Sequence, residues 1–379
     1  MKGMSLDIKK LVNPRTLNLP EYDQIHVTIC WQNAGIQRLM SNESSYVPLE
    51  SVQKAIRDFS SKVNWYPEDG NYALKLRTQL AGYTDTKMDN ITIGNGSMEL
   101  LDLLFQTFIT RPGEDQILIP APDYTAYTNR VKLFGYIPQF ATCGENVEKA
   151  AGEILNKLNP DTKLILFSRP NNPVGKITPK KDILHLLESG VLTIVDEAYV
   201  ELADPGTSVA ALVSQWDNLI VLRSFSKGFG LAGLRLGYVL AHPDVIKYIN
   251  KVRHIFNVNL LAIVAAEALM DDIKNAQRNI DEIRATRDWL EKSLAVLPGF
   301  RVIPSRANFL LVDVGASNKK AGVFVDYLYE NGFFVRDFSK GAGLDKDRYF
   351  RITIGYRKDM QRLLDALIEF ETISNHSAS

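Results

Sequence analysis

Short apolar runs alternate with amphipathic stretches along most of the chain from Asn90 onward. The apolar runs have the length of single strands and lie at 91–94, 116–119, 163–167, 191–195, 219–223 and 236–240. Continuous apolar runs of this length are typical of strands that are buried on both faces, as in parallel sheets. Helical patterns lie between them, for example at 98–110 and 180–189. The alternation predicts an α/β domain built around a mostly parallel sheet.

The pattern changes beyond Pro243, where the chain becomes mostly helical and includes a long amphipathic stretch at 274–297. Shorter strand-like and helical runs follow at 308–312, 323–330, 333–336, 350–354 and from Lys358 onward. This mixture predicts a smaller α+β domain beside the first. We therefore expect a large domain at 51–270, a small C-terminal domain at 271–379, and an irregular N-terminal segment at 1–50 that joins the small domain.

The composition argues against several classes of protein. Lys and Arg number 44, as do Asp and Glu, so the formal net charge is zero and the basic excess of a nucleic-acid-binding protein is missing. The apolar runs fall short of the roughly 20 residues that a membrane-spanning helix needs, and no secretory signal is recognisable at the start. Cys30 and Cys143 lie far apart without the spacing of metal ligands, and two lone thiols fit a reducing cytosol better than a disulfide. We expect a cytoplasmic protein that binds no metal, membrane or nucleic acid.

Polar residues follow several of the predicted strands, at the edge where open α/β sheets bind ligands. The segment Gly94-Asn-Gly-Ser97 opens a helix, where glycines allow close approach and free N–H groups bind anions. A helix capped by Ser97 without a ligand explains the same residues equally well. The segment Arg169-Pro-Asn-Asn-Pro-Val-Gly175 predicts a rigid turn that fixes one amide side chain, although a plain loop has the same composition.

Two further groups carry ionisable side chains. Asp196 ends an apolar strand, where a carboxylate must be paired or used, unless it only caps the next helix. Lys227 lies among glycines and apolar residues between Arg223 and Arg235. Such surroundings favour an amine with a lowered pKa that acts as a nucleophile, and a solvated surface lysine fits these flanks poorly.

The stretch Gly228–Gly233 matches the G-x-G-x-x-G pattern of dinucleotide-binding proteins. That pattern also needs an acidic residue about 20 residues further on, at the end of the next strand. Here the strand is followed by Ala241-His-Pro243, and residue 253 is an arginine. A nicotinamide cofactor is therefore disfavoured.

In chain order, these motifs resemble the fold-type I, class I/II aminotransferases that depend on pyridoxal 5′-phosphate (PLP). The resemblance extends from about Asn42 to Arg351 and rests on Pro-Asn-Asn-Pro-Val-Gly, Asp-Glu-Ala-Tyr, Ser-Phe-Ser-Lys-Gly-Phe-Gly-Leu-Ala-Gly-Leu-Arg and Arg-Ile-Thr-Ile-Gly. It implies an enzyme that moves amino groups between small metabolites. By resemblance, Lys227 holds PLP as an aldimine and then carries a proton between Cα and C4′, while Asp196 keeps the ring nitrogen charged.

The resemblance also assigns the other cofactor contacts. Asn172 and Tyr199 match the pair that hydrogen-bonds the phenolic oxygen O3′, and Tyr124 matches the aromatic residue that stacks on the ring. Tyr66 resembles a tyrosine that reaches the phosphate from a neighbouring subunit, which implies a homodimer, although an ordinary packing role is the alternative. The phosphate ligands implied are Ser224, Ser226, Arg235 and the backbone N–H groups of Ser97 and Met98.

Within the family, the segments at 41–43, 94–97, 226–233 and 335–340 resemble the histidinol-phosphate aminotransferases most closely. This implies ping-pong transfer from histidinol phosphate to 2-oxoglutarate, with Arg351, Arg336 and Asn42 binding the substrates. Structural ion pairs are the alternative roles of the two arginines.

Several positions on the substrate side depart from the branch pattern. Ser44-Ser-Tyr46 replaces its Asn-Pro, Met98 stands where aspartate is common, and a Tyr-x-Pro-Gly element is not recognisable near Tyr22. A lyase resembling threonine-phosphate decarboxylase, or an aminotransferase for an aromatic or other amino acid, therefore stays open.

Overall fold

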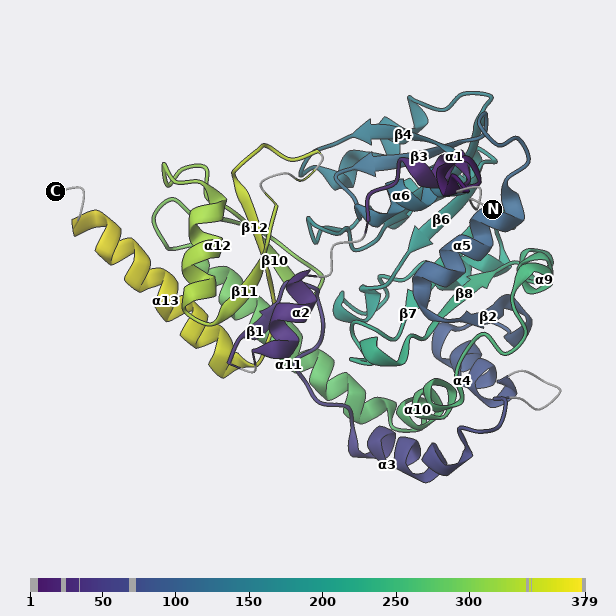
Figure 1. Ribbon diagram of the computed structural model, residues 1–379, viewed down its shortest axis with the longest axis horizontal. Helices are drawn as coiled ribbons and strands as arrows, with labels where there is room; N and C mark the ends of the chain where they lie inside the picture. The colour runs from purple at the N-terminus through teal and green to yellow at the C-terminus, as the bar shows by residue number, and fades with distance from the viewer. Residues whose placement is uncertain are drawn as a thin grey trace, which may run out of the picture.

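The computed structural model describes residues 6–21, 25–33, 35–67, 73–338, 341 and 343–376. These residues form two sheets with helices packed around them, as Figure 1 shows. The sequence motif that ends at Lys340 and the segment around Tyr22 extend outside the described residues. Within the described ranges, no helix has a stretch that is both long and apolar enough to cross a bilayer.

The larger sheet has seven strands, and five consecutive ones, reaching to one edge of the sheet, run parallel to one another. Its order is β2 (Ile91–Gly94), β8 (Gly237–Ala241), β7 (Leu219–Ser224), β6 (Leu192–Asp196), β5 (Thr162–Ser168), β3 (Gln116–Ala121) and β4 (Ile137–Thr142). Strand β8 is antiparallel to both of its neighbours. The predicted α/β architecture with a mostly parallel sheet is therefore confirmed.

Helices cover both faces of this sheet because apolar residues project from both sides of its central strands (Figure 1). One face packs against α4 (Leu74–Thr84), α7 (Ala150–Leu155), α8 (Lys180–Glu188) and α10 (Leu260–Asp271). The other face packs against α5 (Gly96–Phe108), α6 (Ala126–Leu133) and α9 (Pro243–Val252). Burial on both faces explains why the strands stand out in the sequence as continuous apolar runs.

The smaller sheet has five strands and includes a strand from the N-terminal segment. Its order is β1 (Gln37–Leu39), β11 (Phe333–Asp337), β12 (Tyr349–Thr353), β10 (Phe309–Asp313) and β9 (Arg301–Ile303). Strand β1 pairs with β11 in parallel, and the other pairs are antiparallel. The expectation of an irregular N-terminal segment is wrong in part, because β1 and helices lie within it. The domain boundaries at 50 and 270 stay predictions.

The remaining helices lie around these two sheets. They are α1 (Pro14–Leu17), α2 (Ile25–Gln32), α3 (Glu50–Phe59), α11 (Ile273–Leu294), α12 (Ala321–Glu330) and α13 (Arg357–His376). Short 3-10 helices lie at Ile8–Lys10, Ser60–Lys62, Met88–Asn90, Val147–Lys149, Val200–Leu202, Ala210–Ser214 and Ala232–Leu234. Helix α11 matches the long amphipathic stretch of the sequence and extends from the large domain toward the smaller sheet (Figure 1).

Candidate active site

The carboxyl ends of three neighbouring parallel strands bring the candidate site together. Ser168 at the end of β5 lies beside Asp196 at the end of β6, and Asp196 lies beside Leu222 of β7. Lys227 comes shortly after the end of β7. In an open α/β sheet, ligands bind beyond this edge. The motifs that the sequence analysis singles out therefore converge on the edge where a ligand is expected.

Asp196 is buried, and both of its carboxylate oxygens accept hydrogen bonds. Oδ2 accepts from the Tyr127 hydroxyl at 2.7 Å, and Oδ1 accepts from the Ala198 amide at 2.9 Å. Burial raises the pKa of Asp196, while these hydrogen bonds oppose the rise. A cation beside the carboxylate would stabilise its ionised form, so Asp196 is suited to hold a protonated ring nitrogen.

Lys227 has the surroundings of a reactive amine. Its Nζ donates to the carbonyl oxygen of Ser41 at 2.8 Å and lies 5.9 Å from the centre of the Tyr199 ring. Burial, together with the positive charge of Arg351, lowers the pKa of Lys227 from 10.5 to about 8. The charge of Asp196 acts on the pKa of Lys227, and the charge of Lys227 acts on that of Asp196. A lysine with this pKa loses its proton readily near neutral pH, as a nucleophile must.

The hydroxyl of Tyr199 receives two amide hydrogen bonds. Asn42 Nδ2 donates to it at 2.9 Å and Asn172 Nδ2 at 3.3 Å. Because both amides donate to the phenolic oxygen, the Tyr199 O–H is left to donate to another acceptor. Asn42 has a left-handed backbone with φ +56°, and Thr353 holds it by accepting from its amide and donating to its side chain. The N-terminal segment thus contributes directly to the orientation of Tyr199.

Arg235 and the first turn of α5 lie against each other. Arg235 has a left-handed backbone with φ +57°, and a Cβ added to Gly96 would come within 2.6 Å of its Nη2. A Cβ added to Gly237 would come within 2.9 Å of the Ser97 amide nitrogen. The close approach at both places therefore depends on glycine. Backbone N–H groups at Ser97 and Met98 beside a guanidinium suit a phosphate group.

Ser224 and Ser226 complete this group of hydrogen-bond donors. Both are buried, and the Ser224 hydroxyl accepts from the Ser226 amide at 3.0 Å. Ser224 lies opposite Gly237 in the sheet, which places it next to the Ser97 and Arg235 group. All five residues that the resemblance assigns to the phosphate therefore lie at one end of the site.

Tyr124 lies at the same sheet edge, beyond β3. Its ring meets the ring of Tyr127 edge to face, with 5.3 Å between their centres and an angle of 86°. Tyr127 in turn donates to Asp196. Tyr127 therefore contacts both Tyr124, which is expected to cover a cofactor ring, and Asp196, which is expected to hold the ring nitrogen.

Arg351 occupies the side of the site that faces the smaller sheet. Its Nη1 donates to the side-chain oxygen of Asn172 at 2.5 Å, and its Nη2 donates to the carbonyl oxygen of Met40 at 2.7 Å. Its Nε is buried without a partner, and no carboxylate pairs with Arg351 among the described residues. Burial, together with the charge of Arg336, lowers the pKa of Arg351 to about 10. A buried guanidinium that lacks both a carboxylate and a full set of hydrogen-bond acceptors among the described residues suits an anionic substrate.

Arg336 and Tyr66 are less constrained. Arg336 is exposed on β11 and lies opposite Arg351 in the antiparallel pair of β11 and β12. Tyr66 has 76% of its surface exposed and stacks on Phe256, with 4.5 Å between ring centres. Arg336 therefore stands beside Arg351, whereas Tyr66 projects from the large domain without burial in this chain.

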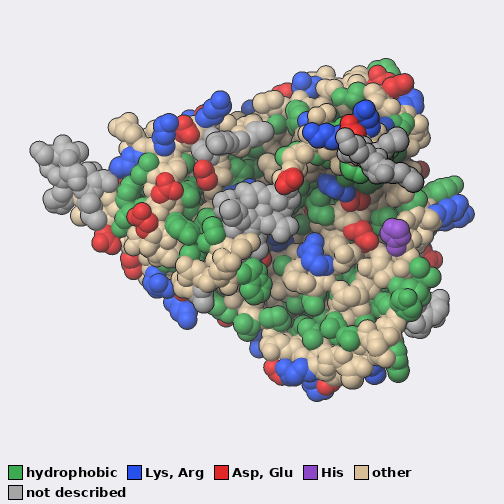
Figure 2. Space-filling view, in the orientation of Figure 1, with side chains coloured by type: hydrophobic (Ala, Val, Ile, Leu, Met, Phe, Trp, Pro, Cys, Tyr) green, Lys and Arg blue, Asp and Glu red, His purple; other side chains and the backbone are tan. Residues whose placement is uncertain are grey.

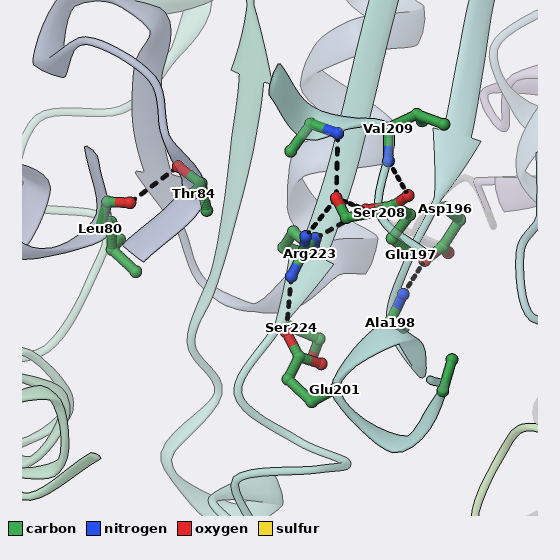
Figure 3. Close-up of polar contacts among 12 residues, drawn as sticks. Leu80, Thr84, Asp196, Glu197, Ala198, Glu201, Ser208, Val209, Arg223 and Ser224 are labelled. Carbon is green, nitrogen blue, oxygen red and sulfur yellow. Dashed lines mark hydrogen bonds and ion pairs between the residues drawn. The ribbon is translucent and has the colours of Figure 1, made fainter. Parts of the chain in front are cut away.

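A buried ionic network joins the strands directly behind the site, as Figure 3 shows. Arg223 on β7 pairs with Glu197 at 3.0 Å and with Glu201 at 2.7 Å. Glu197 also accepts from Ser208 at 2.8 Å and pairs with Arg169 at 3.4 Å. These ion pairs join the segments that follow β5 and β6 to strand β7, so Arg169, Glu197 and Arg223 fix the strand ends that carry the site.

Comparison with known proteins matches the family model described as aminotransferase class I and II to residues 35–367. The chain belongs to this aminotransferase family. A histidinol-phosphate aminotransferase from Thermoanaerobacter sp. (strain X514) is 34% identical over 339 residues, covering 88% of this chain and 92% of that protein. One from Methanosarcina mazei is 33% identical and covers 96% and 97% of the two chains.

Solved structures agree with this family membership. The histidinol-phosphate aminotransferase of Sinorhizobium meliloti, in complex with pyridoxal-5′-phosphate, has a TM-score of 0.81 at 25% identity and covers 95% of this chain and 97% of its own. The L-threonine-O-3-phosphate decarboxylase of Porphyromonas gingivalis has a TM-score of 0.75 at 25% identity, with 88% and 99% covered. The fold-type I architecture expected from the motifs is therefore confirmed.

Sequence reasoning missed two side chains of this aminotransferase that touch the site. Tyr127 donates to Asp196, and the signal that could have found it is a second tyrosine three positions after Tyr124. Asp123 is buried beside Tyr124 and bonds to its amide. A buried carboxylate directly before the expected stacking residue is the signal that could have found it.

Proposed function

We propose that this aminotransferase binds PLP through Lys227 and transfers the amino group of histidinol phosphate to 2-oxoglutarate. The observation that carries the proposal is the placement of Lys227 and Asp196 at the ends of adjacent strands, each acting on the pKa of the other. Relatives named histidinol-phosphate aminotransferase, between 30% and 35% identical, support the choice of substrate.

The residues present fit PLP, which when bound supplies an electron sink for the negative charge that forms at the substrate Cα. Asp196 would hold the ring nitrogen, and Asn172 and Tyr199 would bind the phenolic oxygen. Tyr124 would cover one ring face. The phosphate would be held by Ser97, Met98, Ser224, Ser226 and Arg235.

Lys227 is suited to move a proton because its pKa of about 8 lies near the working pH. In its neutral form the amine would accept the proton that leaves the substrate Cα, and in its charged form it would donate that proton at a second atom, as transamination requires. Asp196 keeps a neighbouring positive charge favourable throughout. The pair therefore serves both half-reactions without a further ionisable residue.

The substrate would be held by residues of the smaller sheet and the N-terminal segment. Arg351, whose Nε has no partner in the described part of the chain, would bind the acidic group of the substrate. Arg336, its neighbour across the strands, would help to bind the phosphate of histidinol phosphate in one half-reaction and a carboxylate of glutamate in the other. Asn42 would contribute beside Tyr199.

We further propose that the protein works as a cytoplasmic homodimer in which Tyr66 reaches the phosphate of the partner's site. Trp65, Tyr66 and Ile255 each expose two thirds or more of their surface. Figure 2 shows apolar side chains gathered on the face over α4 and α10. Large exposed apolar groups of this kind mark protein interfaces. Sedimentation of the wild type and of Tyr66→Ala, with PLP affinity measured for both, tests this arrangement.

A lyase of the threonine-phosphate decarboxylase kind is the second candidate, because the Porphyromonas gingivalis enzyme shares the fold over 88% of this chain. Single-turnover mixing separates the candidates. PLP-loaded protein is mixed in turn with histidinol phosphate, glutamate, an aromatic amino acid and threonine phosphate while the visible absorption is followed. We expect histidinol phosphate and glutamate to abolish the visible band without release of carbon dioxide.

Failure of histidinol phosphate beside success of another donor would overturn the substrate assignment. Release of carbon dioxide from threonine phosphate would favour the lyase. The matched controls are Arg351→Ala, which should lose the response to glutamate, and Arg278→Ala on the exposed surface of α11, which should keep it.

A further inference from the structure

Asp123 is a buried carboxylate for which the proposed reaction has no direct use. Its Oδ1 accepts from the Tyr124 amide at 2.7 Å and also from the Ser168 hydroxyl, while Oδ2 accepts from the Ser168 amide at 3.0 Å. The Ser168 hydroxyl oxygen accepts in turn from the backbone N–H of Asn172 at 2.9 Å. One carboxylate thus contacts the backbone of Tyr124 and reaches Asn172 through a single hydroxyl.

A second bridge joins the same two loops. Asn171 Nδ2 donates to the carbonyl oxygen of Pro122 at 3.1 Å, and its Oδ1 accepts from the Val174 amide at 3.0 Å. The loop after β5 is therefore tied to the loop after β3 at Ser168 and again at Asn171. Asn172 follows the second tie directly, with its side-chain amide directed at Tyr199.

We propose that Asp123 is a positioning residue that sets, through Ser168, the place of the Asn172 amide at the phenolic oxygen of PLP. The inference rests on the PLP site proposed above and extends it to a residue that does not touch the cofactor. Burial raises the pKa of Asp123 to about 8, while the donors that face each of its oxygens favour the ionised carboxylate.

An asparagine at the same position would have the same shape but not the same acceptors. In one orientation its NH₂ group would face the Ser168 amide, and in the other it would face the Tyr124 amide and the Ser168 hydroxyl. Either orientation places donors against donors in a buried place, so the loops must shift. The shift would reach Asn172 because the backbone N–H of Asn172 donates to the Ser168 hydroxyl oxygen.

The experiment compares visible absorption against pH for PLP-loaded wild type and Asp123→Asn, and PLP affinity by titration of the apoprotein. A donor at the phenolic oxygen favours the more negative form of the bound chromophore, so loss of the Asn172 contact should raise the apparent pKa by about half a unit or more. We also expect PLP affinity to fall several-fold. Ser168→Ala, which leaves the carboxylate in place, should move the pKa in the same direction.

The Asn172→Ala background separates positioning from a direct charge effect. If Asp123 acts through Asn172, Asp123→Asn causes no further shift in that background. An equal shift in both backgrounds would show action through space and overturn the proposal, as would unchanged spectra in Ser168→Ala.

Asp115→Asn is the matched control, since Asp115 is buried, accepts from the amides of Thr110 and Arg111, and precedes the opposite end of β3. It should leave the titration unchanged. If the wild type itself shows no visible band with PLP, the proposed function fails. That outcome differs from one in which the wild type has the band but the Asp123 variant titrates as the wild type does, which overturns only the positioning role.

Discussion

The two halves of the candidate site differ in how completely the protein satisfies its own polar groups. On the large-domain side, both oxygens of Asp196 accept hydrogen bonds, and the amide of Asn172 bonds at both ends. On the small-domain side, Arg351 keeps a buried Nε that has no partner among the residues that the structure describes, and Arg336 is exposed. Asp196 and Asn172 are each held by two hydrogen bonds and so keep one position, whereas a guanidinium with a free donor can bind one ligand after another.

This contrast matches the requirements of an aminotransferase in which donor and acceptor bind in turn. The cofactor stays while donor and acceptor alternate, so its side of the site gains from rigidity. The substrate side must accept two different molecules in turn. The predictions below separate the two halves, beginning with the largest effect.

Replacing Lys227 should abolish transamination, because the chain then lacks the amine that attaches PLP and moves the proton. We expect Lys227→Ala to lose at least about 10³-fold in kcat, within the range for a positioned acid–base group. Lys251→Ala, on the exposed surface of α9, is the control and should retain full activity. Substantial turnover by Lys227→Ala would contradict the assigned role.

Breaking the ionic network behind the cofactor half should destabilise the fold. Glu197 is buried and pairs with Arg223 and Arg169, so Glu197→Gln leaves buried cations underpaired and should lower the free energy of unfolding by about 3 kcal/mol. Glu50→Gln removes an exposed partner of Arg57 and should change the free energy of unfolding by less than about 1 kcal/mol. Chemical denaturation of both variants measures the difference, and equal effects would contradict the rigid framework.

The substrate half should show its effects in KM and in specificity. Arg351→Ala should lower kcat/KM for glutamate by about 10²-fold, because a charged hydrogen-bonding group is worth roughly 1.5–3 kcal/mol. PLP affinity should change little by comparison. We expect a smaller loss for Arg336→Ala, since that side chain is exposed. A fall in PLP affinity as large as the fall in kcat/KM would remove the distinction between the halves.

The apoprotein should reveal the lowered pKa of Lys227 in its stability. Below pH 8 the lysine is charged in both the folded and unfolded states, and the folded state bears the penalty of holding the cation. Between pH 8 and 10.5 the unfolded chain binds a proton that the folded one does not, so wild-type stability gains with rising pH.

The shift from 10.5 to about 8 is about 2.5 pKa units, so at roughly 1.4 kcal/mol per unit the free energy of unfolding of Lys227→Met should exceed that of the wild type below pH 8 by about 3.5 kcal/mol. The advantage should shrink as pH rises toward 10.5. Thermal unfolding of the two apoproteins across this range gives the measurement. A difference that stays constant with pH would show that the pKa of Lys227 is not lowered by folding.

The large domain follows from the sequence more directly than the small one. Its central strands are apolar on both faces, so they appear as continuous runs, and Lys227 and Asp196 follow such runs immediately. Strand β4 escaped notice because most of its residues are partly or fully exposed and Pro138 interrupts them. Strand β1 has only three residues and pairs with a strand almost 300 positions away, which no local pattern reveals.

The contacts of the site show the same limit. Asn42 meets Tyr199 only because a left-handed turn and Thr353 hold it there, and 157 positions separate the two residues in sequence. The hydrogen bonds from Asp123 through Ser168 to Asn172 likewise depend on loops from separate strands. Motifs identify which residues act on a cofactor, whereas the residues that position them emerge only from the fold.

Covalent attachment of PLP tests the central claim most directly. PLP-loaded protein is reduced with borohydride, digested and analysed by mass spectrometry, with Lys227→Ala treated in parallel. The account predicts one modified peptide that carries the cofactor on Lys227 and is absent from the variant. Attachment at a different lysine, or none in the wild type, would contradict it.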